Sequence, residues 1–456
     1  MAKKKKKSPT SRAPKRTVAE KPVKPGALEY PCVEGGIWTP VPDPPRPAGA
    51  LAMKFKDVDE KECGLVKAAQ CLTFHTVGCS GCFDSPEPGR RTARAMTAQA
   101  TNPAAFGGYD QARPASFLFH LGDVVYKQAP ESTKDGTVPP SGKDQAALYA
   151  KQFYDQYASY EREIFAIAGN HDSKFNIKPA RSAIGHYRQN FCAPKRKLSA
   201  DNTHEKKRLA MNQPYLYWRL QTPVAHIIGL HTNDVNGGLL DDPMSNKEPQ
   251  FQWLLDTLSG LAAAPDGRAV ILALHYPPYS GAAKFSQRGD PSLAPTPMRN
   301  PAEGLLQPIS IPLQHAFRRS GIFPDLVISA HAHLYQRITY TYTGGRQIPY
   351  LIVGSGGHAE IRDGHAELEQ IAKGCDGKLG KKPTAPFPVV LPRRVILPPG
   401  DKAEVEHFND TDFGYARITV NARNSEIAGE FFVVPQKGNA RCADRFTLDL
   451  RTHRLL

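Results

Sequence analysis

Side chains that can bind metal ions stand directly after four short apolar runs of the 456-residue sequence. They combine a carboxylate, a phenol, an amide and three imidazoles: Asp123, Tyr126, Asn170, His275, His331 and His333. Imidazole nitrogens mixed with oxygen donors suit Zn, Fe or Mn better than Ca or Mg alone. The sequence therefore predicts a metal site assembled from distant parts of the chain.

The spacing within these motifs favours a site for two metals. His331 and His333 are two residues apart, so an extended backbone would point both side chains to one side. Asp123 has two carboxylate oxygens and can bridge neighbouring cations. Two cations about 3.5–4 Å apart can clamp a phosphate and turn a bound water into hydroxide at neutral pH. Gly122 and Gly169 would allow sharp turns where the chain meets the metals.

The apolar runs predict buried strands because they are short and end at glycine, proline or polar residues. They span residues 72–77, 117–121, 164–168, 224–230, 269–274, 326–328 and 350–353. Helices are predicted between them at residues 145–160, 250–261 and 312–319. This alternation favours a layered α/β fold with mostly parallel strands, whose carboxyl ends are where ligands collect.

Composition separates a polar N-terminal segment from a globular body. Residues 1–48 contain five consecutive lysines and many prolines, so we expect a disordered tail and linker. We expect the main domain over residues 49–436, with a surface insertion at residues 360–411, and a C-terminal extension at residues 437–456. Residues 412–434 predict an antiparallel hairpin that closes the domain.

The net charge of +15 is concentrated near the N-terminus, because residues 1–25 hold ten basic residues and one glutamate. The rest of the chain is only mildly basic, so we expect at most a weak electrostatic contact of the lysine-rich tail with nucleic acid. No run of about 18 apolar residues occurs, and no apolar segment follows the lysines, so we expect no membrane span and no secretory leader. Eight sparse cysteines argue against a disulfide scaffold, and we expect a cytoplasmic protein.

The four motifs resemble those of the calcineurin-like metallophosphoesterase superfamily, and in particular of its purple acid phosphatase branch. The family patterns GD-x-x-Y, GNH-[DE], a lone later histidine and GH-x-H stand here as Gly122-Asp123-Val124-Val125-Tyr126, Gly169-Asn170-His171-Asp172, Leu274-His275-Tyr276 and Ala330-His331-Ala332-His333. The resemblance covers about residues 70–435. It implies a four-layer α/β/β/α sandwich with two mixed sheets, and a metal-dependent phosphoester hydrolase with a dinuclear site and a metal-bound hydroxide. The implied cofactors are two divalent or trivalent ions of Fe, Zn or Mn.

The resemblance also implies a role for each motif residue. Asp123 would bridge the two metals. One metal would be bound by Asn170, His275 and His331, and the other by His333 and Tyr126. His171 would face the phosphate, where it would stabilise transition-state charge or protonate the leaving oxygen. Asp172 would orient His171, although a carboxylate that caps the turn would look the same in the sequence.

The first motif departs from the family, which has GD-x-[GH] after its opening strand. Here Gly78 is followed by Cys79, and three alternatives remain open. Cys79 could bind a metal as a thiolate, which would favour Zn or Fe at that position. The first metal site could instead be weak, with water or Asp84 in place of the missing carboxylate. The protein could also have lost two-metal chemistry and bind a phosphate-bearing ligand without turnover. A second change, Ala330 in place of a glycine, keeps a small residue.

The remaining histidines and cysteines are expected to be structural. His75 lies too far back in its strand to reach the site, and His226 lies on or beside another strand. His358 ends a glycine-rich turn that could line the pocket or be a plain turn. A C-x-x-C spacing that ends at Cys82 resembles a redox motif. The Pro-Glu-Pro-Gly text at residues 86–89 argues against the helix which that motif would need.

Overall fold

The computed structural model describes twelve stretches of the chain: residues 37–38, 51–82, 85–126, 142–175, 183–232, 249–282, 309–358, 360–362, 365–367, 371, 381–391 and 396–456. The predicted tail at residues 1–48, apart from residues 37–38, lies outside the described residues, as does Asp84. None of the helices in the described part of the chain has the length and apolar content that crossing a membrane requires.

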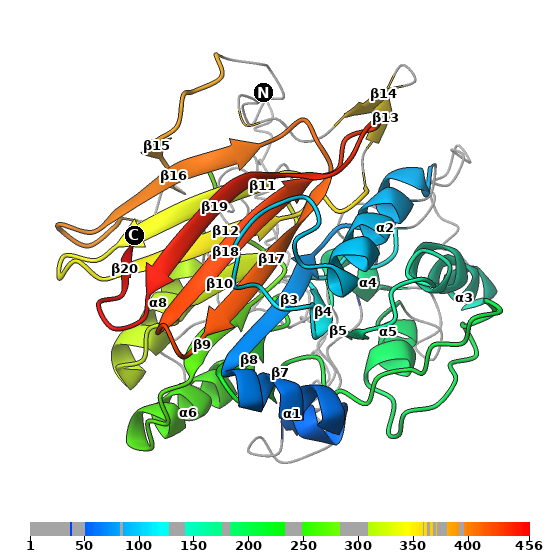
Figure 1. Ribbon diagram of the computed structural model, residues 1–456, viewed down its shortest axis with the longest axis horizontal. Helices are drawn as coiled ribbons and strands as arrows, with labels where there is room; N and C mark the ends of the chain where they lie inside the picture. The colour runs from blue at the N-terminus through cyan, green and yellow to red at the C-terminus, as the bar shows by residue number, and fades with distance from the viewer. Residues whose placement is uncertain are drawn as a thin grey trace, which may run out of the picture.

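The larger of two extended sheets has nine strands in the order β15-β16-β11-β12-β10-β9-β8-β7-β2 (Figure 1). Their bounds are β2 Ala52–Lys54, β7 Trp218–Gln221, β8 Ala225–Gly229, β9 Ala269–Ala273, β10 Leu326–Ser329, β11 Tyr335–Thr341, β12 Gln347–Val353, β15 Phe387–Pro388 and β16 Lys402–Asn409. Strands β8, β9, β10 and β12 run parallel, whereas β7 and β11 pair antiparallel with their neighbours β8 and β12. The sheet is therefore mixed.

The second sheet has seven strands in the order β20-β19-β18-β17-β3-β4-β5. Their bounds are β3 Cys71–Val77, β4 Phe117–His120, β5 Glu163–Ala166, β17 Gly414–Asn421, β18 Glu426–Val433, β19 Arg441–Asp449 and β20 Arg454–Leu455. Strands β3, β4 and β5 are parallel, and the others pair antiparallel. The predicted hairpin is confirmed as β17 and β18.

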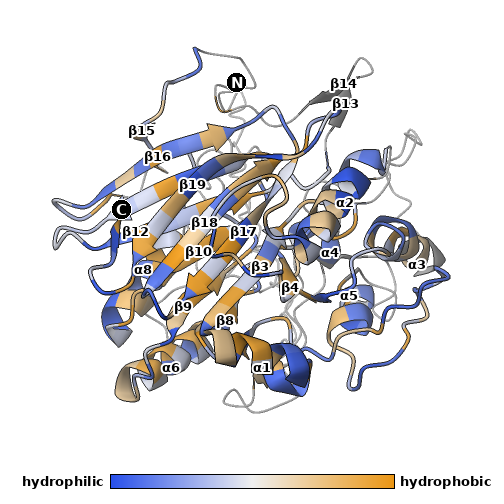
Figure 2. Ribbon diagram, viewed as in Figure 1, coloured by the Kyte–Doolittle hydropathy of each residue, from blue (hydrophilic) through white to orange (hydrophobic). Residues whose placement is uncertain are grey.

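The two sheets pack face to face through aromatic side chains. Phe119 of β4 stacks on Trp218 of β7, with 6.0 Å between the ring centroids. Tyr335 of β11 stacks on Phe431 of β18 at 3.9 Å. In Figure 2 the central strands β8, β9 and β10 are mostly apolar, as burial on both faces requires.

Helices cover the outer faces of both sheets. The helical elements are η2 Phe55–Asp57, α1 Glu60–Ala69, α2 Glu87–Thr101, α3 Gly142–Tyr149, the π-helical η3 Ala150–Tyr154, α4 Asn170–Ser173, α5 Ala183–Phe191, α6 Pro249–Ala263 and α8 Ser310–Ser320. Trp253 of α6 contacts Tyr217 beside the nine-stranded sheet. Gln99 of α2 bonds to His75 of the seven-stranded sheet. The predicted four-layer α/β/β/α arrangement with two mixed sheets is confirmed.

Two predicted boundaries need correction. Strand β16 lies within the predicted surface insertion, yet it pairs with β11 along its whole length. Strands β19 and β20 lie within the predicted C-terminal extension, yet they extend the seven-stranded sheet beyond β18. Both segments are polar because they lie toward the sheet edges. Their alternation of buried and exposed residues was too weak to distinguish them from surface chain.

No helix starts within the described residues 79–82, which form the C-x-x-C spacing that ends at Cys82, as expected. Helix α2 begins at Glu87, with Pro86 as its N-cap and Pro88 in its first turn. The first backbone N–H groups of a helix have no partner within the helix, so proline costs little there and its fixed φ favours the start. The short strands β1 Ile37–Trp38 and β6 Lys174–Phe175 form a separate pair, as do β13 Glu360–Arg362 and β14 His365–Glu367.

Candidate metal centre

The candidate metal ligands gather where the carboxyl ends of parallel strands from both sheets meet. Cys79, Asp123 and Asn170 follow β3, β4 and β5 of the seven-stranded sheet. His275 and His331 follow β9 and β10 of the nine-stranded sheet. Each sheet therefore supplies part of one site, which neither sheet could build alone.

One group of donor atoms lies around Asn170. Its Oδ1 is 3.1 Å from Nε2 of His275 and 3.0 Å from Nδ1 of His331. These two imidazole nitrogens are 3.3 Å apart. Oδ2 of Asp123 lies 3.2 Å from Nε2 of His275. All four side chains are buried, so water does not separate their polar atoms.

The hydrogen-bond chemistry of this group fits a cation. Nδ1 of His275 donates to the carbonyl oxygen of Leu121 at 2.7 Å, since a carbonyl can only accept. In the neutral ring, Nε2 then carries a lone pair that faces the oxygens of Asn170 and Asp123. Lone pairs facing one another require either an additional proton or a metal ion between them. The residues present therefore fit a metal of the type that imidazole and oxygen ligands prefer.

A second group of donors also meets Oδ2 of Asp123. The hydroxyl of Tyr126 donates to Oδ2 of Asp123 at 2.9 Å and lies 3.1 Å from Nε2 of His333. Sγ of Cys79 and donor atoms of Asp123 and His275 all lie within 4.8 Å of one another. The Asp123 carboxylate is thus shared by both groups, and Cys79 stands at the position where the sequence departs from the family.

Burial determines the protonation of this second group. Burial, followed by the negative charge of Asp123, raises the pKa of Cys79 and that of Tyr126 well above their usual values. Burial opposes ionisation of Asp123 too, but the positive charges of His275 and His171 outweigh it and hold its pKa well below normal. The thiol and the phenol thus stay protonated unless a cation is nearby, whereas the carboxylate is ionised in either case.

Three of these residues adopt a left-handed backbone conformation: φ is 53° at Cys79, 53° at Asp123 and 65° at His331. The prediction that an extended backbone points His331 and His333 to one side is therefore wrong. The amide of Ala332 donates to the carbonyl of Ala330 at 2.7 Å, which closes a tight turn. Because of this turn, His331 reaches the first donor group and His333 the second. Strained backbone of this kind is typical of functional sites.

Small residues let the loops approach one another. Gly122 has a φ of 87°, as the predicted sharp turn requires. Gly169 serves a different purpose, because a Cβ there would collide with the Asp123 carboxylate. A Cβ at Gly78 would collide with that of Ala330. The alanine that replaces the family's glycine is thus accommodated by a glycine on the facing loop.

His171 lies at the edge of the site. Its backbone amide donates to Oδ1 of Asp123 at 2.8 Å, and its ring centroid is 4.3 Å from that of Tyr126. The side chain is partly exposed, unlike the buried donors of the first group. This position leaves the imidazole next to the donor cluster and accessible from solvent.

Asp172 joins two loops of the site. Its buried carboxylate accepts hydrogen bonds from the amides of Val124 at 3.1 Å, Val125 at 3.3 Å and Gly169 at 2.9 Å. Burial and the nearby charge of Asp123 raise its pKa to about 7. These bonds fasten the loop after β4 to the loop after β5. The orientation of His171 by Asp172 stays a prediction from the sequence.

Sequence reasoning left His358 undecided, and the structure places it at the site. Its ring stacks on that of Tyr126, with centroids 3.5 Å apart and planes inclined by 4°. It also meets His333 edge-on at 4.7 Å. Its amide donates to the carbonyl of Cys79 at 2.9 Å. The signal was available, since His358 stands shortly after strand β12, as the other motif residues follow their strands.

Two other histidines lie in separate environments, as expected. His75 is fully buried between Tyr160 and Gln99, each 3.0 Å from a ring nitrogen. His226 lies 3.1 Å from Asp266 at the opposite end of the nine-stranded sheet. Both act as buried polar side chains with partners of their own.

Three examples illustrate the solved structures that resemble this chain. The first is purple acid phosphatase PPD1 from yellow lupin (Lupinus luteus) seeds, at 16% identity and a TM-score of 0.49; the match covers 84% of this chain and 55% of that one. The chain thus spans just over half the length of the lupin protein. GAP50, the anchor in the inner membrane complex of Plasmodium, matches at 13% identity and a TM-score of 0.44. The match covers 82% of this chain and 89% of GAP50. PhoD matches at 12% identity and a TM-score of 0.47. The match covers 85% of this chain and 71% of PhoD.

Among proteins with curated descriptions, none gives a significant match. The sequence profile of the calcineurin-like phosphoesterases matches residues 99–335, which is more than half of the chain. The matched range contains Asp123, Asn170, His275 and His331 and begins after Cys79. The chain belongs to the calcineurin-like phosphoesterase family.

Proposed function

We propose that the protein is a phosphoester hydrolase, a phosphatase or phosphodiesterase, that depends on two metal ions. The observation that carries the proposal is the shared position of the Asp123 carboxylate. It contacts His275 of one donor group and Tyr126 of the other. A carboxylate between two sets of ligand atoms, at the carboxyl ends of strands from two sheets, suits a bridged pair of cations.

The two metals would be bound by different sets of side chains. Asn170, His275 and His331 would hold one metal, and Tyr126 and His333 the other. When bound, the metals would supply Lewis acidity that polarises a phosphoryl oxygen and lowers the pKa of water. A phosphoester would approach from the exposed side, where His171 lies.

Residues around the ligands would orient the reaction. The His171 imidazole would stabilise charge on the phosphoryl group or give a proton to the leaving oxygen. Asp172 would keep the loops after β4 and β5 in register through its three amide bonds. His358 would hold the Tyr126 ring in place by stacking.

The ligand types restrict the metals to Fe, Zn or Mn in this proposal. A Tyr126 phenolate would suit ferric iron, as in the purple acid phosphatase branch that the sequence resembles. A Cys79 thiolate would favour Zn or Fe over Mn. The substrate would be any phosphoester small enough to reach His171. The cytoplasmic location and the weak contact of residues 1–25 with nucleic acid stay predictions from the sequence.

Metal removal tests the proposal directly. The protein as purified is expected to contain close to two metal ions per chain, measured by plasma mass spectrometry, and to hydrolyse p-nitrophenyl phosphate or bis(p-nitrophenyl) phosphate. Chelation should reduce both the metal content and the hydrolysis to background, and addition of Zn, Mn or Fe should restore both. Undiminished hydrolysis by chelated protein, or a purified protein that binds no metal, would disprove a metal-dependent hydrolase.

A second candidate is a degenerate family member that binds a phosphate-bearing ligand without turnover. The observation that favours it is Cys79, which stands where the family has a metal-binding aspartate.

The role of Cys79 can be tested by spectroscopy. If Cys79 is a thiolate ligand, cobalt-substituted protein should show a sulfur-to-metal charge-transfer band. Cys79→Ser should lose that band and bind metal roughly tenfold more weakly, or worse. Cys79→Asp should lose the band and keep the metal. An unchanged band in Cys79→Ser would exclude the thiolate, and a large gain in rate in Cys79→Asp would favour a decayed site.

A further inference from the structure

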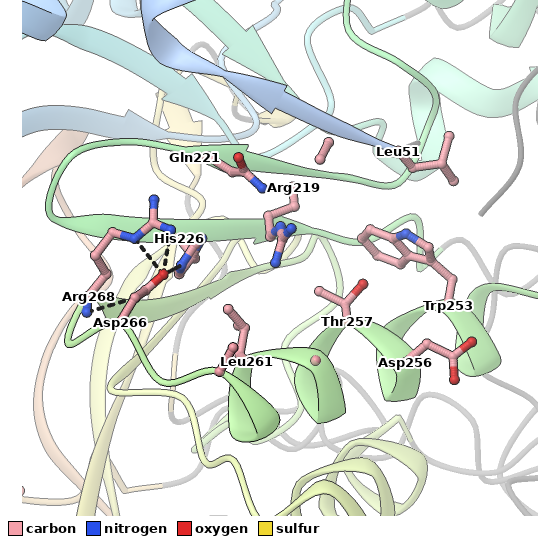
Figure 3. Close-up of a pocket in the computed structure, with 13 residues that line it drawn as sticks. Leu51, Arg219, Gln221, His226, Trp253, Asp256, Thr257, Leu261, Asp266 and Arg268 are labelled. Carbon is pink, nitrogen blue, oxygen red and sulfur yellow. Dashed lines mark hydrogen bonds and ion pairs between the residues drawn. The ribbon is translucent and has the colours of Figure 1, made fainter. Parts of the chain in front are cut away.

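A cavity of about 430 Å³ lies between the edge of the nine-stranded sheet and helix α6. One wall is formed by β7 and β8, through side chains such as Arg219 and His226. The other is a single face of α6, from Trp253 through Thr257 to Leu261 (Figure 3). We call this space the α6 cavity. Its volume is within the range of about 300–1,000 Å³ that is typical of sites for small molecules.

The α6 cavity extends from the start of β8 and β9, away from the candidate metal centre, to Arg219, which pairs with Ile228 of β8. His226 is near the start of β8, and Arg268 immediately precedes β9. The metal-centre residue His275 follows the end of β9, whose five residues span roughly 16 Å. None of the residues that line the α6 cavity is a candidate metal ligand, so a ligand bound there would occupy a separate site.

Two acidic residues line the cavity, and one of them, Asp266, is already held in an ion pair. Asp266 pairs with the Arg268 guanidinium, whose Nε lies 2.9 Å from Oδ2, and it lies 3.1 Å from Nε2 of His226. Arg268 also donates to the carbonyl oxygen of Thr222 at 3.0 Å. Burial lowers the pKa of His226 to about 4, so the ring is neutral at pH 7. Asp266 and Arg268 thus cancel.

Arg219 supplies a positive charge that no side chain pairs with directly in the described part of the chain. Within the described part of the chain, its guanidinium has no hydrogen-bond or ion-pair partner. Figure 3 shows it between β7 and α6, while the carboxylate of Asp256 is directed away from it and accepts a hydrogen bond from Gln252 instead. Burial, with Arg268 nearby, lowers the pKa of Arg219, which reflects the free-energy cost of a charge held here.

We propose that the α6 cavity binds a small organic carboxylate, whose charge pairs with Arg219. A planar carboxylate matches the fork of the guanidinium and accepts two parallel hydrogen bonds. Such a carboxylate would supply the ion-pair partner that Arg219 lacks within the described part of the chain. A dianionic phosphate would instead place two negative charges in a cavity that Asp256 and Asp266 already line.

The rest of the cavity suits an apolar, planar body attached to that carboxylate. Trp253 closes one end with its indole, and Leu51 and Leu261 add aliphatic surface. Gly260 faces open space, because a Cβ built on it meets no atom within 4 Å. Gln221 on the opposite wall offers an amide to a polar substituent. An aromatic or short aliphatic carboxylate therefore matches both the charge and the shape.

The test compares benzoate with benzamide, its neutral isostere, by isothermal titration calorimetry on the full chain. Wild-type protein is expected to bind benzoate about tenfold or more tightly than benzamide. Arg219→Gln should remove this preference, and Gly260→Leu should weaken both ligands by filling the cavity. Hydrolysis of aryl phosphates should stay unchanged in both variants, because neither position touches the metal centre.

Two matched variants serve as controls. Arg441→Gln removes an exposed arginine on β19, and Gly64→Leu adds the same side chain to an open position of α1. Both should bind benzoate as the wild type does. Equal binding of benzoate and benzamide, no binding of benzoate, or wild-type binding by Arg219→Gln would each overturn the proposal. Loss of benzoate binding in Arg441→Gln would do so too, because it would show a nonspecific charge effect.

Discussion

Replacing His171 with asparagine is expected to lower kcat for phosphoester hydrolysis by about 10²- to 10⁴-fold while the metal content stays the same. The imidazole lies at the partly exposed edge of the site, 4.3 Å from the Tyr126 ring between centroids, and the backbone amide of His171 donates to the Asp123 carboxylate. Its side chain can therefore be removed without removing a metal ligand. Steady-state kinetics and metal analysis of the same preparation measure both quantities.

Asn170→Ala is the matched comparison for His171→Asn. Asn170 lies next in the sequence, but its Oδ1 contacts both His275 and His331, so its loss should reduce the metal content as well as the rate. The leaving group refines the role of His171. If the ring donates a proton, the loss should be greater for an alkyl phosphate than for p-nitrophenyl phosphate, whose leaving group needs no proton. A His171→Asn protein that also loses metal would contradict the role we assign.

Stability is expected to fall steeply as the pH drops below about 6.5, because three histidines are buried in their neutral form. Burial lowers the pKa of His75 and of His120 to about 3, and that of His226 to about 4. In the unfolded chain each histidine takes up a proton near pH 6.5. The unfolded state therefore binds more protons between pH 6.5 and these lower values. The stabilisation is complete above pH 6.5 and is lost as the pH falls toward 4 and 3.

The expected slope is about 1.4 kcal/mol per pH unit for each histidine, or roughly 4 kcal/mol per unit for the three together. Urea unfolding at several pH values between 7.5 and 5 measures it. His75→Gln should reduce the slope by about one histidine's share, and so should His226→Gln, which serves if the first variant does not fold. Both positions lie away from the metal centre, so metal binding should not confuse the comparison. An unchanged slope in both variants would show that other groups control the acid response.

Local patterns were sufficient to predict much of the fold. The apolar runs at residues 72–77, 117–121 and 269–274 correspond to β3, β4 and β9, with ends that shift by one residue. Such strands are buried on both faces, so their sequences are short, continuous apolar segments. The metal-binding side chains that follow these strands could also be recognised from the sequence, because ligands collect at the carboxyl ends of parallel strands.

Local patterns failed where an element owes its position to distant partners. Strand β16 is polar, and its pairing with β11 joins residues more than sixty positions apart. Helix α2 starts among prolines, which suggest a loop unless the helix start is recognised. For His358 the sequence left a pocket residue and a plain turn equally open, because its stacking on Tyr126 depends on how the two sheets pack.

By itself, the sequence determined which side chains are available for metal chemistry and that they follow strands, since both are local properties. Only the tertiary structure decided that two sheets share the site, that Asp123 contacts two donor groups, and that Arg219 faces α6 without a direct ion-pair partner in the described part of the chain. The physical reason is that burial of both sheet faces sets their relative position. That packing brings together residues whose separation along the chain carries no information about their distance in space.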